Sequence, residues 1–593
     1  MFTVLKRFAV TQAPSDNYYT LMFDEMSIKK HFQYNPKDDI IEGYQDHGTH
    51  GRSAAIASYA LVFMISGIRK RFKQPIAHYF SSGFSTADRL AVLIKEVLFQ
   101  CFEAGINVAA IVCDMDGVNR RALTILGSTV EQPFINLYNK EIVTFFDPPH
   151  LLKCFRNMFI KYNIEMTTQI SSDGLVGKGI AKWSHIKEFY EVDSTNPNFV
   201  YAPVLKKDHL DPNSKQKMKV NLAAQVLSHS VAGGMLARIS NGSIGTEAAV
   251  TASLVADMDK LFDLMNADSP DLRRGKPHST NWSSTSPHAE FFKKMKLFFQ
   301  TMKFIGSPRK PPSQDGWLTT LNAFLRLRKN LEAVNITRLA TRRLQQDPIE
   351  NLFGCIRGNC GSNTNPTCGQ FVAGLKTAIL SNLSHIGKSG NCENDNNTII
   401  NNFDTFLSVS QSQPTYTSTE TEFVVEDMPE IREENIEEGN AEIQACAYVC
   451  GFIVKKNKNE CKTCHKTFLA QTMEPQHLFV ECREYNELKK SLNYVTKPMI
   501  ACVECCATLV NKILKENGHT NFIKKNIREN IISKINFDFL NECVEHKETN
   551  IEHIINSVFN ICTKRFCILK NRSFSQEASA AALNRKMKII LHK

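Results

Sequence analysis

The residues from Ile106 to Asp114, INVAAIVCD, form a continuous apolar run that ends in an acid. A run of this length and composition predicts a strand that is buried on both faces in the middle of a sheet. The amphipathic segment before it, from Thr86 to Gly105, predicts a helix that Thr86 caps and Gly105 ends. A helix followed by a fully buried strand is typical of an α/β fold, and it brings Asp114 to the carboxyl edge of the sheet.

Further β-forming segments surround this strand. Residues 18–50 contain extended segments, and Ala60–Ile68 and Gln74–Ser82 are two strand candidates joined by a basic turn. Downstream, a helix is expected to begin at Gly117, and a strand is expected from Glu141 to Asp147. Three strands, a helix, a strand, a helix and a strand follow the order of an RNase H-like fold.

The rest of the chain divides by composition. Residues 393–442 hold 13 acids and one base although the whole chain carries a net charge of +11, so the remainder is strongly basic and suits a polyanion such as DNA. No apolar run reaches the ~18 residues of a membrane span, and the first residues are too polar for a secretory signal. We therefore expect a soluble, intracellular protein with no membrane partner. The expected domains are the N-terminal part of the RNase H-like domain (1–155), a mostly helical insertion (156–340), the C-terminal part of the RNase H-like domain (341–385), an acidic disordered linker (386–445) and a cysteine-rich, basic, α-helical domain (446–593).

A late segment, RLQQDPIENLFGCIRG, carries two acids one helical turn apart. Asp347 has the chemistry of a helix N-cap, Pro348 suits the first helical position, and Glu350 lies where the acid of a capping box lies. The segment therefore predicts a helix start. The same carboxylates could instead bind a metal ion, and local sequence alone leaves both interpretations open.

Several motifs together resemble a known family. They are IVCDMDGVNRRAL (111–123), FFDPPHLLKCFRN (145–157) and QQDPIENLFGCIRG (345–358), supported by FDEMSIKK (23–30), NLAAQVLSHSVA (221–232) and AYVCGFIVKK (447–456). In this order they resemble the P element transposase family and its THAP-domain relatives in animals, over about residues 18–385 and again near residue 450.

The resemblance implies an RNase H-like catalytic domain of the DDE type, which uses divalent metal ions to cut and rejoin DNA in the nucleus. It also implies a guanine-nucleotide-binding insertion, and it leaves a homo-oligomer open. Full-length relatives begin with a zinc-binding THAP domain, whereas here the catalytic fold is expected almost from Met1. We therefore expect a truncated or domesticated transposase. The alternative is a catalytically inactive nuclear factor, derived from a transposase, that binds DNA or protein.

Three carboxylates are the expected ligands of Mg²⁺ or Mn²⁺, because hard cations prefer oxygen donors. Asp114 is the candidate second ligand and Glu350 the third. For the first ligand, Asp46 in GYQDHG is preferred over Asp24 in FDEM. Asp147 is a further candidate, with a helix-capping role as its alternative.

Nucleotide binding is implied by the resemblance alone, because the insertion has neither a GxxxxGK[ST] loop nor a strand followed by GxGxxG. The resemblance assigns contacts with GTP to Lys219 and Val220, and recognition of the guanine base to Asp263 and Asn266. A carboxylate and an amide can together recognise the donor edge and O6 of guanine. Asp347 could face the same pocket.

The C-terminal region holds CKTCHKT followed by QHLFVEC. Cys461, Cys464, His477 and Cys482 could form a tetrahedral zinc site, although their order matches no finger motif. Buried free thiols are the alternative. Other partners left open are His465, Cys446, Cys450, Cys502, Cys505 and Cys506.

Overall fold

The computed structural model describes residues 1–83, 86–169, 176–195, 199–269, 278–381, 440–457, 461–484 and 491–591. Most of the expected acidic linker, 386–439, lies outside these residues, and helix α15 (Ala441–Lys456) begins before the expected end of the linker. In the part of the chain that the structure describes, no helix has both the length and the apolar character needed to span a bilayer.

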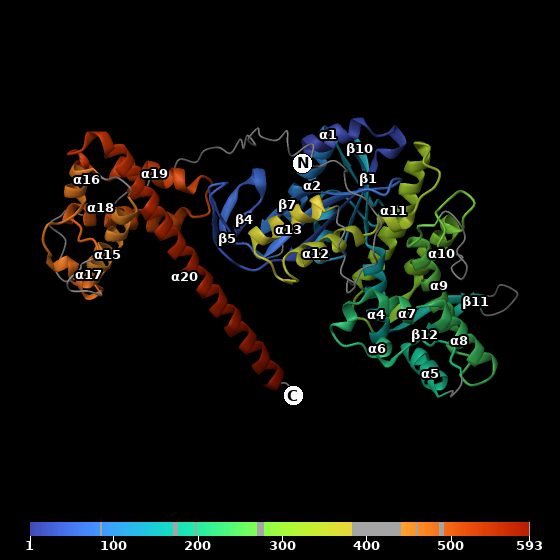
Figure 1. Ribbon diagram of the computed structural model, residues 1–593. Helices are drawn as coiled ribbons and strands as arrows, with labels where there is room; N and C mark the ends of the chain where they lie inside the picture. Colours follow the sequence, from blue (N-terminus) through green and yellow to red (C-terminus); the bar gives the residue numbers. More distant parts are fainter. Residues whose placement is uncertain are drawn as a thin grey trace.

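A ten-stranded sheet forms the centre of the N-terminal half (Figure 1). Its strands follow the path β2-β3-β4-β7-β6-β1-β8-β10-β9, and β5 pairs with β4. Strands β1 and β10 both run parallel to β8, whereas β6 is antiparallel to both β1 and β7. The central order β7-β6-β1-β8-β10 confirms the RNase H-like fold. The strands are β1 (Tyr18–Ser27), β2 (Gln33–Asn35), β3 (Ile40–Glu42), β4 (Tyr44–Asp46), β5 (Arg52–Ile56), β6 (Tyr59–Gly67), β7 (Lys73–Ser81), β8 (Asn107–Cys113), β9 (Phe134–Leu137) and β10 (Lys140–Phe146).

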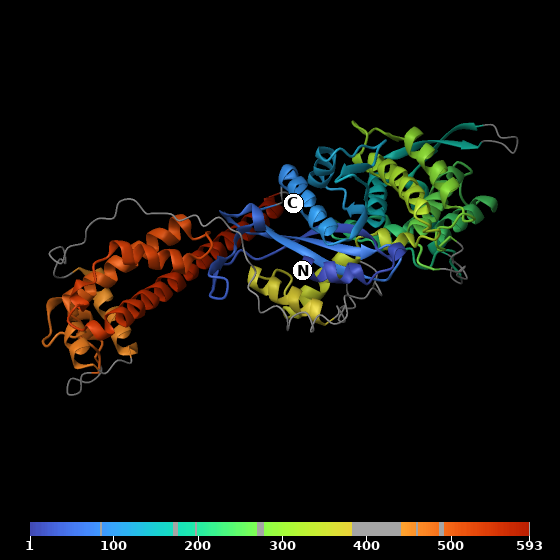
Figure 2. The ribbon, with the colours of Figure 1, turned by 90° about the horizontal axis from the view of Figure 1, so that it is seen from above.

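The apolar run that predicted the central strand is β8, and its side chains from Ala110 to Cys113 are fully buried. The predicted helix before it is α2 (Ala87–Glu103); the Thr86 hydroxyl accepts a hydrogen bond from the Arg89 backbone N–H, and Gly105 has a φ of +78°. Figure 2 shows α2 on one face of the sheet and α12 and α13 on the other. The remaining helices of this domain are α1 (Phe2–Val10), α3 (Gly117–Ile125), α4 (Pro148–Lys161), α12 (Asp347–Asn359) and α13 (Cys368–Leu380).

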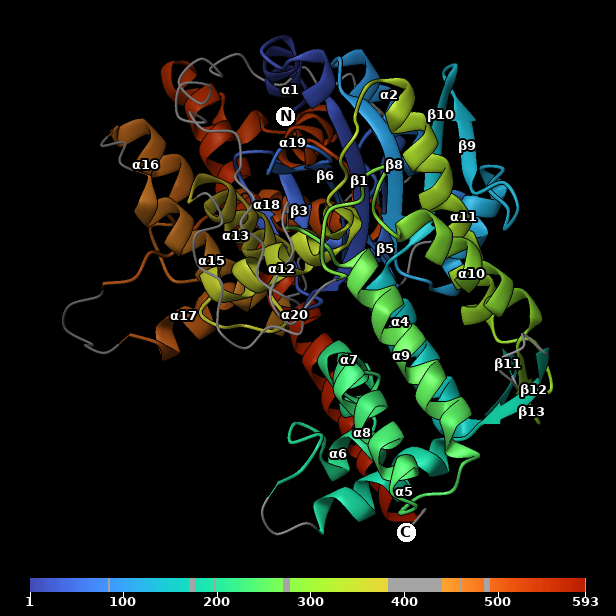
Figure 3. The same cartoon turned by 90° about the vertical axis from the view of Figure 1, so that its right-hand side faces the viewer.

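The insertion is mostly helical, as expected, but it also contains a small sheet of the order β12-β11-β13. Its last helix, α11, packs against β10 of the ten-stranded sheet (Figure 3). A Cβ atom on Gly316 of α11 would meet the side-chain ends of Met115 and Leu151, which would have to shift, so glycine favours this close approach. The elements are β11 (Asn163–Gln169), β12 (Val176–Ala181), β13 (Lys303–Ile305), α5 (Trp183–Ser194), α6 (Lys207–Leu210), α7 (Val220–Val226), α8 (His229–Ser240), α9 (Ala248–Met265), α10 (His288–Thr301) and α11 (Pro312–Ala333).

The C-terminal region is a helical bundle that contacts the β2–β4 end of the ten-stranded sheet (Figure 1). Phe32 packs against Phe566 and Phe574, and the Asn571 amide bonds to both the backbone N–H and the carbonyl of Phe32. At the same end, the Asp39 carboxylate accepts hydrogen bonds from two backbone N–H groups at the start of α19. The helices are α15, α16 (Lys462–Phe468), α17 (Leu478–Cys482), α18 (Lys497–Asn517), α19 (Ile523–Lys534) and α20 (Lys547–Leu591).

Candidate active site

Three acids lie in one row across neighbouring parallel strands. Met22 of β1 and Phe145 of β10 both pair with Val112 of β8. Asp24, Asp114 and Asp147 each follow those residues by two positions, so they occupy the next equivalent row of the sheet. Neighbouring strands are about 4.8 Å apart, and the carboxyl ends of β8 and β10 therefore bring acids beside Asp24.

Helix α12 brings Glu350 to the same place. Its Oε1 atom lies 3.0 Å from Nε2 of His150, which is on the first turn of α4. The expected capping box is absent from this helix start, because the N-cap residue is Gln346 and makes no side-chain cap hydrogen bond. The Gln346 amide instead donates to the Phe23 carbonyl, at 2.9 Å, and this bond ties the start of α12 to β1.

The electrostatics of Asp24 show how closely these groups approach. Burial raises the pKa of Asp24 to about 7, and the charges of Asp114 and Glu350 raise it as well, although His150 and the Glu25 backbone N–H act in the opposite direction. Burial alone would lower the pKa of His150, but its hydrogen bond to Glu350 and the nearby charge of Asp147 raise it to about 9. The site therefore contains acids that repel one another and one imidazolium that partly compensates them.

Asp147 is fully engaged by backbone groups. Its Oδ2 atom accepts from the His150 backbone N–H at 3.2 Å and caps α4, while Oδ1 accepts from the Gln346 backbone N–H at 2.9 Å. Burial raises the pKa of this carboxyl. These contacts favour the capping role that the sequence left open, since both oxygens are used to join α4 to the segment before α12.

The structure places the two candidates for the first acid on different strands, Asp24 on β1 and Asp46 on β4. Asp46 is on β4, which is separated from β1 by β7 and β6, so about 14 Å lie between the two strands. Its carboxylate lies 3.4 Å from the Arg52 guanidinium and accepts from the Gly48 backbone N–H. Asp46 therefore lies apart from Asp114 and Glu350, and Asp24, the second choice, lies beside them.

The donor set fits a hard divalent cation. Asp24, Asp114 and Glu350 offer oxygen atoms alone, and the repulsion that raises the pKa of Asp24 is what a cation between the acids would relieve. Oδ1 of Asp114 accepts from the side chain of Asn119 and from the Asp116 backbone N–H, which orients the carboxylate. Within the described residues, no three acids place one oxygen each within 4.8 Å of one another, so the acids are neighbours without a preassembled cage.

The residues expected to read a guanine base lie at the end of α9. Asn266 is its C-cap, and the Asn266 backbone N–H donates to the Asp263 carbonyl at 3.2 Å. The Oδ1 atom of Asn266 is buried and has no hydrogen-bond partner. Burial and the positive charge of Lys260 lower the pKa of His278, and the nearby Asp263 carboxylate opposes this effect in part. A buried unsatisfied side-chain amide at this position suits a hydrogen-bonding ligand.

The residues just before α12 are hydrogen-bonded to this end of α9. The Thr341 hydroxyl donates to the Leu264 carbonyl at 2.7 Å, and the Gln345 amide donates to the Met265 carbonyl at 3.1 Å. Asp347 follows on the first turn of α12, with Oδ2 lying 3.7 Å from Nη2 of Arg342. Asp347 is thus two residues beyond the last of these contacts and one helical turn before Glu350.

Lys219 and Val220 are at the start of α7, where Lys219 is exposed and Val220 is half-buried. The loop before them is held by α4, because the Arg156 guanidinium and the Asn157 amide both donate to the Lys217 carbonyl, at 3.1 and 3.3 Å. Both α7 and α9 pack against α4.

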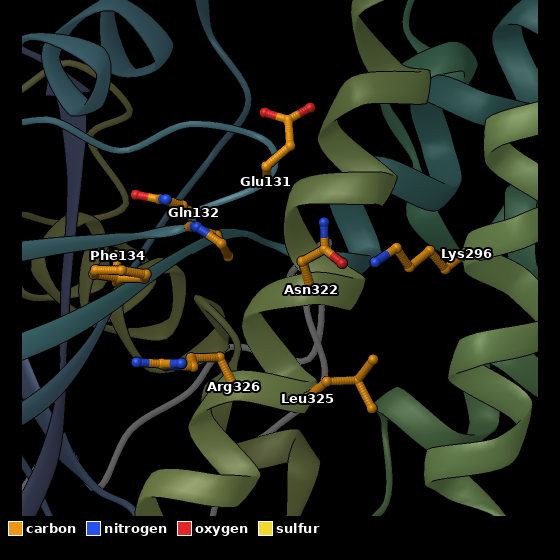
Figure 4. A pocket seen from close by; sticks show the side chains of 8 residues that line it. Glu131, Gln132, Phe134, Lys296, Asn322, Leu325 and Arg326 are labelled. Carbon is orange, nitrogen blue, oxygen red and sulfur yellow. The ribbon is translucent and has the colours of Figure 1, made fainter.

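A cavity of about 440 Å³ lies elsewhere, between the loop before β9 and helices α10 and α11 (Figure 4). Two of its polar side chains already have structural partners. Arg326 makes two hydrogen bonds to the Glu141 carboxylate, and the Asn322 amide donates to the Val130 carbonyl. None of the candidate site residues lines it.

The expected zinc ligands do not come together. His477 is fully buried, its Nε2 atom donates to the Val495 carbonyl at 2.7 Å, and its Nδ1 accepts from the Glu474 backbone N–H. Cys482 is exposed at the end of α17. Cys461 and Cys464 instead lie beside Cys543 and His546. The sequence signal for these partners is the C-x2-H pair CVEH at 543–546, which complements the C-x2-C pair CKTC at 461–464.

Three family descriptions match the chain in order. Residues 1–127 match the TNP-like RNase H N-terminal domain, residues 149–276 the TNP-like GTP-binding insertion domain, and residues 343–375 the TNP-like RNase H C-terminal domain. The matched segments contain strands β1 to β8, then helices α4 to α9 of the region that follows, and finally α12 with the first part of α13.

Two curated proteins and one solved structure are similar to the chain. The Transposable element P transposase of Drosophila melanogaster is 24% identical over 373 residues, which are 62% of this chain and 45% of that protein. The DNA transposase THAP9 of Homo sapiens is 25% identical over 292 residues, 45% of this chain and 29% of that protein. The chain thus spans less than half the length of either relative.

The structure of the Drosophila P element transposase strand transfer complex matches with a TM-score of 0.53 and 22% identity, covering 64% of this chain and 81% of that chain, and it shows a shared fold. The family matches and the sequence relatives agree with the strand order and the helical insertion described above. The chain therefore belongs to the P-element-like transposase family and carries its RNase H-like and GTP-binding insertion domains.

Proposed function

We propose that the chain is a DDE-type DNA transposase in which Asp24, Asp114 and Glu350 hold divalent metal ions for DNA cleavage and strand transfer. The observation that carries the proposal is the shared register of β1 and β8 together with the convergence of α12 on their carboxyl edge. Acids that are far apart in the sequence influence one another's ionisation there. Such an arrangement is unfavourable for folding, and a role in binding cations accounts for it.

Mg²⁺ or Mn²⁺, bound by these oxygens, would activate the attacking oxygen and neutralise the leaving oxygen of a phosphodiester. The protein groups around them orient the ligands. His150 holds Glu350 through the 3.0 Å hydrogen bond, and Asn119 holds Asp114. Because a charged His150 compensates the acids before cations bind, it also keeps the empty cluster from opening.

GTP is the second proposed ligand. Asp263 would accept hydrogen bonds from the donor edge of guanine, and the Asn266 amide, turned over so that Nδ2 takes the place of the unsatisfied Oδ1, would donate to O6. Lys219 and Val220 would contact the nucleotide from the start of α7, and Asp347 would face it from α12. Since Asp347 and Glu350 are one helical turn apart, nucleotide binding would reach the catalytic helix directly.

DNA is the proposed substrate, and the nucleus is the proposed compartment. The net charge of +11 would attract DNA phosphates, and this predicts binding that weakens as the salt concentration rises. A tagged chain should accumulate in the nucleus, and the mass of the purified protein in solution should establish whether a homo-oligomer forms.

The test of catalysis is a cleavage and strand-transfer assay on labelled DNA with Mg²⁺, Mn²⁺ or chelator. Wild type should cut only with a divalent ion, and Asp24→Asn, Asp114→Asn and Glu350→Gln should each reduce the rate by roughly 10³-fold or more. Asp46→Asn is the matched control and should cut at the wild-type rate. If wild type binds DNA but never cuts it, or if Asp46→Asn alone is inactive, the inactive nuclear factor becomes the better description.

The test of nucleotide binding is the thermal stability of the protein with GTP and with ATP. GTP at roughly 100 times its dissociation constant should stabilise wild type by about 3 kcal/mol, whereas Asp263→Ala should lose this shift. Asp257→Ala is the control, because Asp257 is on the same helix and pairs with Lys294 at 2.7 Å on the surface. Equal shifts in both variants would remove the assignment.

A further inference from the structure

We propose that Cys461, Cys464, Cys543 and His546 bind a structural zinc ion that fixes helix α16 to the start of α20. These four residues come from two segments about 80 positions apart. Cys461 precedes α16 and Cys464 is on its first turn, while Cys543 and His546 flank the short turn that leads into α20. The inference does not depend on the proposed catalytic function.

The geometry is that of a tetrahedral site. The Sγ atoms of Cys461 and Cys543 are 3.8 Å apart, and Sγ of Cys543 is 3.2 Å from Nδ1 of His546. One ligand atom from each of the four residues lies within 4.8 Å of the others. With Zn–S bonds of about 2.3 Å and Zn–N bonds of about 2.0 Å, tetrahedral ligands are about 3.5–3.8 Å apart. A 3.8 Å contact is also far too long for a disulfide, whose sulfurs are about 2.05 Å apart.

The chemistry of the four donors selects zinc. Three thiolates and one imidazole match the Cys₃His sets of structural zinc sites, and the two ligand pairs have the spacings C-x2-C and C-x2-H. The backbone N–H groups of Cys464 and Thr463 donate hydrogen bonds to the sulfur of Cys461, which orients this ligand. Four protein ligands leave no open position for a substrate, so the ion serves the fold.

A buried side chain, Asn550, donates a hydrogen bond to one of the four ligands. The Asn550 amide, on the first turn of α20, donates to Sγ of Cys464 at 3.3 Å, and Asn550 is 2% exposed. Its Oδ1 atom accepts from the Asn457 amide at 2.8 Å, which fixes the orientation of the Asn550 amide. Buried donors to ligand sulfurs are typical of metal sites, because they hold the ligand and stabilise the thiolate.

The other cysteines of this region lack these features. Sγ of Cys446 lies 3.9 Å from Sγ of Cys450, both on α15, but no imidazole joins them. Burial raises the pKa of Cys450 well above its usual value, and the pKa of Cys506 on α18 is likewise raised, by its hydrogen bond to Cys502 and by burial. Such thiols remain protonated and pack as small apolar groups.

The experiment measures zinc in the full chain, purified with a reductant and without chelator, by elemental analysis and by zinc release when the thiols are blocked. Wild type should hold about one zinc per chain. Cys543→Ser should reduce the zinc content roughly tenfold. Cys482→Ser, which changes an exposed cysteine of the same region, should leave it unchanged.

Two further measurements keep the inference testable if Cys543→Ser does not fold. His546→Cys retains four ligands and should keep the zinc, and Asn550→Ala should weaken zinc affinity by about 10–100-fold while the chain stays folded. Cobalt added in place of zinc should give the absorption of a tetrahedral site with three sulfur ligands. The assignment would be overturned if wild type stayed metal-free after incubation with zinc, or if Cys482→Ser lost as much zinc as Cys543→Ser. A disulfide between Cys461 and Cys543 that persisted in the protein purified with reductant would also overturn it.

Discussion

Asp24→Asn should stabilise the catalytic sheet in the absence of metal ions while it abolishes catalysis. Burial and neighbouring acids raise the pKa of Asp24 from 3.8 to about 7. Since one pH unit is worth about 1.4 kcal/mol, ionising Asp24 in the folded protein costs up to about 4 kcal/mol relative to the unfolded chain. The asparagine has no charge to bury, and after solvent screening we expect a gain of about 1–3 kcal/mol at pH 8.

The sign of the pH dependence follows from the direction of the shift. Between about pH 4 and pH 7 the folded protein keeps a proton on Asp24 that the unfolded chain has released, so stability falls as the pH rises through this window. Above about pH 7 Asp24 is ionised in both states, so its effect on the free energy of unfolding no longer changes with pH. The difference between wild type and Asp24→Asn should therefore be near zero at pH 4 and largest at pH 8.

Hydrogen exchange of the β1 and β8 amides measures this locally, which suits a chain with several domains. At pH 8 without metal ions, exchange in Asp24→Asn should be slower by roughly 5–150-fold than in wild type. Mg²⁺ should slow exchange in wild type and have little effect on the variant. Asp46→Asn is the control, because it removes a carboxylate that contacts Arg52 and should leave the Mg²⁺ response intact. Faster exchange in Asp24→Asn at pH 8, or an undiminished Mg²⁺ response, would refute the reasoning.

Three further changes test the contacts around the site and the C-terminal helix. His150→Ala should cost about 1–3 kcal/mol below pH 6.5, and the cost should disappear as the pH rises through 9, because the raised pKa of about 9 reflects the charged contact with Glu350; denaturation at pH 6 and pH 10 measures this. Gln346→Ala leaves a β1 carbonyl without its donor and should lower the free energy of unfolding by about 1–3 kcal/mol. Asn571→Ala removes both hydrogen bonds to Phe32, and limited proteolysis should then cut the second half of α20 faster than in wild type.

Local sequence predicted those parts of the site that depend on local patterns. The run ending at Asp114 has no polar residue between Val108 and Cys113, and such a run specifies a central strand and the position of the acid at its end. The choice between Asp24 and Asp46 required the order of strands in the sheet. Both acids occur on extended segments, and only the pairing of β1 with β8, some 90 residues later, selects Asp24.

The start of α12 and the zinc ligands failed to be predicted for related reasons. A capping box is a local pattern, and the contact of Glu350 with His150, about 200 residues away, replaces it. The ligands Cys543 and His546 are separated from Cys461 by helices α17 to α19, so proximity in the sequence favoured His477 and Cys482 instead. Partners that meet only after the chain folds back cannot be selected by spacing alone.

The position of α20 has a consequence for the folding of the protein during translation. Strand β2, at residues 33–35, leaves the ribosome long before helix α20 (547–591), which covers this edge of the sheet. Until α20 is synthesised, the backbone hydrogen-bonding groups of β2 and the ring of Phe32 lack this cover, and exposed edge strands can pair with other chains. Efficient production of this protein should therefore depend on chaperones that bind the nascent chain, and fragments that stop before α15 should precipitate.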